Sequence, residues 1–280
     1  MADKAGNGGV LRHRQDGQVV SGSLATLLPE WQTGERWLFI TPHDDDPVIA
    51  AGMILYAAVS AGVSVSVRIV SDGSMGYTSA VGPDRIVETR RQETMESFGL
   101  LGIEDVQWYG YPDSRLHRFQ GRWPVGAAGT ADIDRDAERP YSGIQDSIVR
   151  DLRSLRPGRV LTLAGSDLHP DHRIVFWETR MSVFHAAGDI WPDCGAALGT
   201  PPPIYEFAAY SPFADVPDWQ YNASADELQR KLDAIRAYRS QTQIAALFAS
   251  ILEAGPVEHM RSVPTESYHP GLYTAFFERA

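Results

Sequence analysis

Residues 37–70 read WLFITPHDDDPVIAAGMILYAAVSAGVSVSVRIV, with polar breaks between apolar runs. The run WLFIT is short, apolar and followed by Pro42, which is typical of a buried strand. Pro47 and Gly62 then frame an Ala-rich segment, and proline at the start with glycine after the end predicts a helix. The run VSVSVRIV at 63–70 predicts a second strand. The stretch therefore predicts a strand, a helix and a strand in that order.

The same alternation continues along the chain. We expect strands at 105–109, 159–164 and 204–210, helices at 83–101, 142–155 and 171–187, and a long loop at 115–141. We also expect a helical segment at about 225–253 that is interrupted near Ser240. Strands that alternate with such helices predict an α/β fold, a three-layer sandwich with a mostly parallel sheet between helices. Sites in such sheets form at the carboxyl ends of the strands. We expect a partly ordered lead-in segment at 1–33, then a single domain at 34–280 with a C-terminal helical extension.

Composition narrows the class of protein. The chain has 280 residues, with 25 Lys and Arg against 36 Asp and Glu, and a formal net charge of −11. Nucleic-acid binding requires a clustered excess of cations, so this balance argues against it. The first ten residues lack the cationic start and apolar core of a signal peptide, and no apolar run reaches membrane-spanning length. We therefore expect a cytoplasmic protein without a membrane segment.

The single cysteine, Cys194, excludes an intramolecular disulfide and any metal site built from several cysteines. A chain with one cysteine suits a compartment where thiols stay reduced. Any metal ion must therefore be held by histidines and carboxylates.

The strongest functional signal follows the first predicted strand, where His43 precedes Asp44, Asp45 and Asp46. Three consecutive carboxylates at the end of a buried strand repel one another unless a cation or hydrogen-bond donors balance them. A divalent metal ion supplies that balance. Taken alone, the run is also explained in part as the N-terminal cap of the following helix.

A second group of the same residue types, His169, Asp171 and His172, follows the strand predicted at 159–164. Taken alone, this group also fits a loop held by local hydrogen bonds. Because both groups follow strands of one predicted sheet, we expect them to meet at one edge and to bind one ion.

A histidine with an aspartate three residues later, joined by a histidine from elsewhere, makes a three-ligand site with one open position. That pattern is typical of catalytic rather than structural zinc. The remaining carboxylate and histidine are then available for proton transfer. Together these features predict metal-assisted hydrolysis.

Five motifs occur in a fixed order over about residues 37–190. They are His43 to Asp46, Ser71 to Gly73, Arg90 to Glu93 with Leu101-Gly102, Gly110 to Asp113, and His169 to His172. In this order they resemble the PIG-L/LmbE-like deacetylases. The resemblance implies a Rossmann-like fold and the use of zinc, or another divalent metal such as Fe²⁺. It also implies removal of N-acyl groups, most often acetyl from N-acetylglucosamine-type sugars.

The resemblance further implies roles for eight residues. They are the metal ligands His43, Asp46 and His172, the general base Asp45, the polarising or protonating imidazole His169, its tuning partner Asp171, and the sugar contacts Arg90 and Asp113. The chain departs from the family pattern at two positions. Many members have a small residue or proline where this chain has Asp44, and a glutamate where it has Pro47. The extra carboxylate is expected to raise the pKa of Asp45 or to strengthen the hold on the metal.

We therefore expect a metal-dependent N-deacetylase that acts on a small N-acetylated amino sugar or glycoconjugate. One alternative keeps the site and changes the substrate, to the N-acyl group of a peptide, an antibiotic or a thiol-sugar intermediate. A non-catalytic nucleotide-binding domain is disfavoured, because carboxylates rather than a glycine-rich loop follow the first strand and would repel a pyrophosphate. We expect the segment after Ala225 to wall the pocket or to pack against a second subunit of a homo-oligomer.

Overall fold

The computed structural model describes residues 9–125, 140–265 and 269–277, and a mixed sheet of nine strands lies at the centre of this part of the chain. Five neighbouring strands run parallel, in the spatial order β5 (Asp105–Tyr111), β4 (Ser64–Ser71), β3 (Arg36–Thr41), β8 (Arg159–Leu163) and β9 (Ile204–Phe207). β3 and β8 are buried almost throughout, because helices cover both of their faces. The α/β fold with a parallel arrangement is confirmed for these strands.

Antiparallel strands extend the sheet beyond β9. In spatial order they are β11 (Val257–Val263), β10 (Trp219–Asn222), β1 (Val10–Gln15) and β2 (Gln18–Gly22). β1 and β2 lie within the segment for which the sequence predicts only a lead-in, so residues 10–22 instead belong to the sheet. Polar and charged residues fill most of these two strands, so no apolar run marks them.

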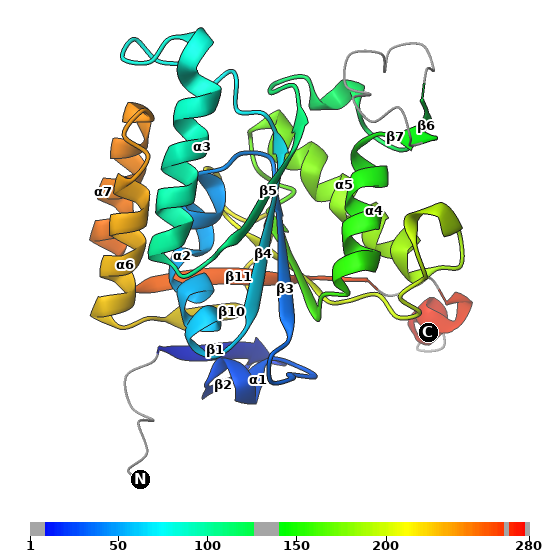
Figure 1. Cartoon of the computed structure of the whole chain (residues 1–280). Helices are drawn as coiled ribbons and strands as arrows, with labels where there is room; N and C mark the ends of the chain where they lie inside the picture. Colours follow the sequence, from blue (N-terminus) through cyan, green and yellow to red (C-terminus); the bar gives the residue numbers. More distant parts are fainter. Residues whose placement is uncertain (1–8, 126–139, 266–268, 278–280) are drawn as a thin grey trace.

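Helices cover both faces of the sheet (Figure 1). One face carries α2 (Asp46–Ser60), α3 (Pro83–Leu100), α6 (Ala225–Arg236) and α7 (Ala245–Ala254), and the other carries α4 (Ile144–Leu155) and α5 (Pro170–Ala187). The helical segment expected at 225–253 is two helices, and the interruption expected near Ser240 lies between them, with the 3₁₀ turn η3 (Thr242–Ile244) directly before α7. α6 packs directly on α2, the helix that follows β3. The loop between β3 and α2, residues 42–45, is called the first site loop, and the C-terminal helical region thus covers the helix that follows it.

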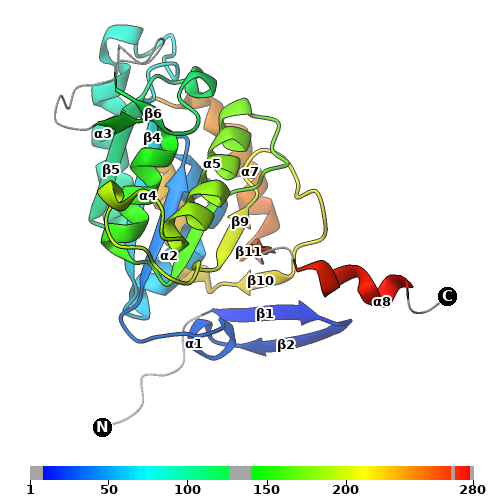
Figure 2. The ribbon, with the colours of Figure 1, turned by 90° about the vertical axis from the view of Figure 1, so that its right-hand side faces the viewer.

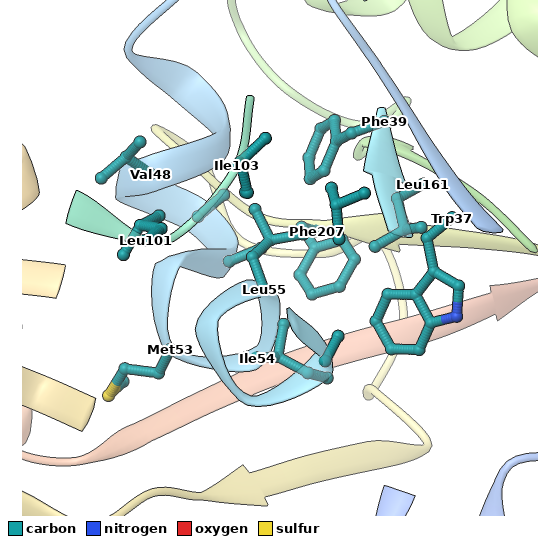
Figure 3. Packing of buried hydrophobic residues seen from close by; sticks show 14 of the residues in the cluster. Trp37, Phe39, Val48, Met53, Ile54, Leu55, Leu101, Ile103, Leu161 and Phe207 are labelled. Carbon is teal, nitrogen blue, oxygen red and sulfur yellow. The ribbon is translucent and has the colours of Figure 1, made fainter. Parts of the chain in front are cut away.

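Aromatic and aliphatic side chains from adjacent strands form the core beneath α2 (Figure 3). Phe39 of β3 and Phe207 of β9 have ring centroids 5.9 Å apart, and Leu161 of β8 and Leu55 of α2 belong to the same cluster. Burial of one such side chain contributes about 1.5–3 kcal/mol. This packing fixes β3 against α2, and the loop between those two elements is the first site loop.

Smaller elements complete the described part of the chain. They are α1 (Leu24–Leu27), η1 (Leu116–Arg118), η2 (Pro192–Cys194), η4 (Pro270–Tyr273), α8 (Thr274–Phe277) and a separate pair of short strands, β6 (Trp123–Pro124) and β7 (Tyr141–Ser142). The loop expected at 115–141 contains η1 and β6, and its residues 126–139 lie outside the described residues. Figure 2 shows α8 extending away from the sheet. Within the described ranges no helix is long and apolar enough to cross a membrane.

Candidate metal centre and active site

The loop after β3 and the first turn of α5 meet at the carboxyl ends of the parallel strands. Asp46 Oδ2 lies 3.2 Å from His43 Nδ1 and 3.3 Å from His172 Nε2. The backbone N–H of His43 donates to the same oxygen at 3.2 Å, and Thr41 Oγ1 donates to the carbonyl of His43 at 3.0 Å. All three predicted ligand side chains are buried and adjacent, although His172 is 126 positions beyond Asp46 in the sequence.

Two further carboxylates approach the other nitrogen of His43. Asp113 Oδ1 lies 3.4 Å and Asp171 Oδ2 lies 3.7 Å from His43 Nε2. Backbone donors hold both groups in place, because Met75 N donates to Asp113 at 3.1 Å and Ser114 N donates to Asp171 at 3.0 Å. His43 therefore belongs to two groups that could each hold a cation, one with His169 and His172 and one with the two carboxylates.

Unsatisfied polar atoms mark the same point. Asp46 Oδ1 and both ring nitrogens of His172 are buried and have no hydrogen-bond partner of acceptable geometry among the described residues. Buried polar atoms are normally paired, and an unpaired one calls for a missing water or ion. Imidazole and carboxylate are ligands that zinc accepts, so the residues present fit a divalent metal ion.

The electrostatics of the cluster also favour a cation. Burial lowers the pKa of His43, but hydrogen bonds to Asp113, Asp171 and Asp46 outweigh it and hold that pKa well above its usual value. Burial likewise lowers the pKa of His172, yet the negative charge of Asp46 and the Asp167 carboxylate beside its Nδ1 raise it to about 9. Positive charge at this point is therefore strongly stabilised, which is the environment that a metal ion requires.

Asp44 and Asp45 face Arg90 of α3 rather than the ligand cluster. The Arg90 guanidinium donates to both oxygens of Asp44, one of them at 3.2 Å, and to Asp45 Oδ1 at 3.1 Å. Thr94 Oγ1 adds a hydrogen bond to Asp44 at 3.0 Å. Burial raises the pKa of Asp45 to about 6, against the opposing charge of Arg90.

Two expectations concern these residues. Arg90 is buried and paired with two carboxylates, and the sugar contact that the resemblance implies for it stays a prediction. Asp44 is turned toward α3, and its charge adds to the raised pKa of Asp45, which is one of the two effects expected of the extra carboxylate. The physical reason for this orientation is pairing, because a buried carboxylate is retained where a cation and hydrogen bonds compensate it.

His169 borders the cluster, with its ring centroid 4.7 Å from that of His43 and 4.8 Å from that of His172. Its Nδ1 accepts a hydrogen bond from the backbone N–H of Asp171 at 3.2 Å, so the neutral ring carries its proton on Nε2. Burial and the charges of the two neighbouring histidines lower the pKa of His169. A neutral donor is thus held beside the ligands, as a polarising imidazole must be.

Two residues of this site were absent from the sequence predictions. Asp167 Oδ2 lies 3.2 Å from His172 Nδ1, and its other oxygen accepts from the backbone N–H of His169 at 2.9 Å. The ring of Tyr210 lies over that of His172, with centroids 5.1 Å apart. Asp167 stands two residues before His169 in the same loop, so its position was the available signal, whereas no motif marks Tyr210.

A second acidic group contains Asp146, Asp193 and Cys194. Arg122 and Arg150 pair with both carboxylates, so their charge is already balanced. Burial raises the pKa of the Cys194 thiol to about 11, so this thiol is a poor nucleophile at neutral pH.

Comparison with known protein families identifies the family of this chain. A family profile described as "PIG-L: GlcNAc-PI de-N-acetylase" matches residues 38–180, just over half of the chain. The chain belongs to the PIG-L family. The region matched by the PIG-L profile contains the loop after β3, the loop after β8 and every predicted site residue.

Two relatives of this PIG-L chain are described as deacetylases. Diacetylchitobiose deacetylase of Thermococcus kodakarensis is 25% identical over 212 residues, which cover 74% of this chain and 70% of the relative. The probable N-acetyl-alpha-D-glucosaminyl L-malate deacetylase 2 of Bacillus cereus is 25% identical over 221 residues, which cover 74% of this chain and 83% of the relative.

Solved structures share the fold of this PIG-L chain. N,N′-diacetylchitobiose deacetylase from Pyrococcus horikoshii superimposes with a TM-score of 0.63 at 22% identity. The aligned region covers 90% of this chain and 95% of the Pyrococcus chain. GalB, the 4-carboxy-2-hydroxymuconate hydratase of Pseudomonas putida, has the same TM-score at 17% identity, covering 84% of this chain and 98% of its own. Because the second protein is a hydratase, the shared fold alone does not define the reaction.

Proposed function

We propose that this chain is a metal-dependent hydrolase that removes the N-acetyl group of an N-acetylglucosamine-type amino sugar or glycoconjugate. The observation that carries the proposal is the convergence of His43 and His172 on one oxygen of Asp46, with His169 beside them and Asp45 next to Asp46 in the same loop. The deacetylase descriptions of both relatives support the reaction class.

In this proposal His43, Asp46 and His172 hold the metal ion, as Zn²⁺ or another divalent ion such as Fe²⁺. A divalent ion there supplies Lewis acidity, which polarises the acetamide carbonyl and lowers the pKa of the attacking water. Asp113 borders these ligands and is the residue proposed to contact a sugar hydroxyl.

Asp45 accepts the proton of the attacking water as the water oxygen bonds to the acetamide carbon. Arg90 orients Asp45 for this task, because it donates to Asp45 Oδ1. This positioning role is proposed in addition to the sugar contact that the resemblance implies for Arg90.

His169 donates from Nε2 to the oxyanion that develops on the carbonyl oxygen. The backbone N–H of Asp171 holds the required tautomer by donating to Nδ1. When the C–N bond breaks, the amine nitrogen receives the proton that Asp45 took from the water, and the second water proton leaves with the acid, so the products at neutral pH are acetate and the protonated amine.

The test pairs metal content with release of amine. We expect about one divalent ion per chain in protein purified without chelator, and amine release from N-acetylglucosamine or N,N′-diacetylchitobiose. His172→Ala is expected to abolish both. His13→Ala is the matched control, because His13 stacks on Trp219 in the antiparallel part of the sheet.

Metal without release from these sugars, but with release from another N-acyl compound, would favour the amidase alternative. A wild-type chain that binds no divalent metal under any loading condition would contradict the mechanism. We also propose a cytoplasmic location, supported by the single cysteine.

A further inference from the structure

The helix α2, whose first turn carries Asp46, is broken five residues after that ligand. Ala51 has φ −139° and ψ 17°, which are not helical values. Beyond the break, the N–H groups of Met53 and Ile54 donate to the two carboxylate oxygens of Glu258, at 3.0 and 2.8 Å. Glu258 lies on β11, so a side chain of the antiparallel strands caps the second half of α2.

A buried lysine completes this cap. Lys231 Nζ of α6 lies 2.7 Å from Glu258 Oε1, and both side chains are only 3% exposed. Gly52, directly after the break, is what lets Lys231 approach, because a Cβ at that position would lie 2.9 Å from Lys231 Cγ. The break, the glycine, the carboxylate and the lysine thus form one unit.

We propose that Glu258, supported by Lys231, is a positioning residue that sets the direction of the first turn of α2 and thereby places Asp46 in the metal centre. The inference rests on the proposed function, since it concerns the ligand assigned there. It also links the antiparallel strand β11 and the helix α6 to the metal centre.

The hydrogen-bonding pattern of a helix supports this role. In an unbroken helix Met53 and Ile54 would donate to the carbonyls of Ile49 and Ala50, one turn earlier. Glu258 takes these donors instead, and a carboxylate at the start of a helical segment is favoured by the helix dipole as well as by the hydrogen bonds. The two halves of α2 are thereby free to point in different directions.

A pocket of about 240 Å³ lies beside the break, and its lining includes Ile49, Ala50, Lys231 and Glu258. The pocket borders the first turn of α2 at Ile49, whereas Val48 of the same turn is fully buried in the core. A buried ion pair costs desolvation free energy that an apolar pair avoids, so its presence here points to a geometric role rather than to stability.

The experiment measures Zn²⁺ affinity and amide hydrogen exchange in the full-length chain. Glu258→Gln keeps the shape and loses the charge, and we expect about tenfold or weaker Zn²⁺ binding with faster exchange at Met53 and Ile54. Glu35→Gln is the matched control, because Glu35 is paired with Arg159 in another buried ion pair, at the opposite end of β3. We expect its Zn²⁺ affinity to equal that of the wild type.

Each outcome decides the inference. If Glu258→Gln does not fold, the double variant Lys231→Met with Glu258→Gln removes the unpaired charge and is expected to show the same loss of affinity. Unchanged Zn²⁺ affinity in these variants, or an equal loss in Glu35→Gln, would overturn the inference while leaving the proposed function intact. A wild-type chain that binds no Zn²⁺ would instead overturn the proposed metal site, and unchanged exchange at Met53 and Ile54 would then overturn the inference as well.

Discussion

Asp45 and Asp46 are neighbours in sequence, yet their side chains contact different partners. Asp46 faces two histidines, whereas Asp45 is held by Arg90. One carboxylate can therefore bind a metal ion while the other exchanges protons.

This separation predicts the effect of Asp45→Asn. We expect kcat for amine release to fall by about 10²–10⁴-fold, which is the usual contribution of a general base. The metal content is expected to stay that of the wild type, because Asp45 is not among the proposed ligands. Kinetics and elemental analysis on the same preparation measure both quantities, and loss of the metal together with activity would place Asp45 among the ligands instead.

The pairing of Arg90 predicts a loss of stability rather than of substrate affinity alone. Arg90→Met leaves Asp44 and Asp45 buried without a cation, which is expected to lower the free energy of unfolding by about 3–5 kcal/mol. Urea unfolding measures this change. Arg239→Met removes an exposed pair with Glu96 and is the control, expected to unfold like the wild type. Unchanged stability with a raised KM would favour the direct sugar contact.

At the level of single residues, the sequence predicted the positions that carry characteristic chemistry. His43, Asp46 and His172 could be paired because each follows a predicted strand of one sheet. The partner of Arg90 could not be predicted, because the burial of a cation depends on how α3 packs against the loop after β3. Asp167 was missed although it shares a loop with the predicted residues.

At the level of elements, a strand could be predicted from the sequence where helices bury both of its faces. β3 and β8 have helices on both faces, so their sequences are continuous apolar runs that are visible without a structure. β11 reads VEHMRSV and buries Glu258, whose partner Lys231 is distant in sequence, so hydrophobic periodicity did not mark it. The β1–β2 hairpin had one local signal, Asp16-Gly17, with φ of 50° and 79°, which is the dipeptide typical of tight hairpin turns.

A capping box closes the start of α6, and its contribution to stability can be measured. Ser224 Oγ accepts from the N–H of Glu227 at 3.2 Å, and the Glu227 carboxylate accepts in return from the N–H of Ser224 at 2.6 Å. Ser224→Ala removes one of these bonds and is expected to lower the free energy of unfolding by about 1 kcal/mol. Ser250→Ala is the control, because Ser250 donates only within its own exposed turn of α7. Equal midpoints of denaturation for both variants would show that the cap contributes nothing.

At the level of the whole molecule, folding itself assembles the proposed metal centre. The loop after β3 and the start of α5 are brought together only because β3 and β8 are adjacent in the sheet. In the unfolded chain these ligands are far apart, so a metal ion that needs all three binds the folded state alone. Metal binding is therefore linked to global stability.

This linkage predicts a metal-dependent melting temperature. Free Zn²⁺ at a hundred times its Kd stabilises a folded state by about 2.7 kcal/mol, which for a chain of this size raises Tm by roughly 5 °C. His172→Ala is expected to abolish the shift, whereas Asp45→Asn is expected to retain it, since Asp45 acts on the proton and not on the ion. Differential scanning calorimetry of metal-free and loaded protein measures all three. A shift of equal size in His172→Ala would mean that Zn²⁺ binds elsewhere on the molecule, and the assignment of the three ligands would then fail.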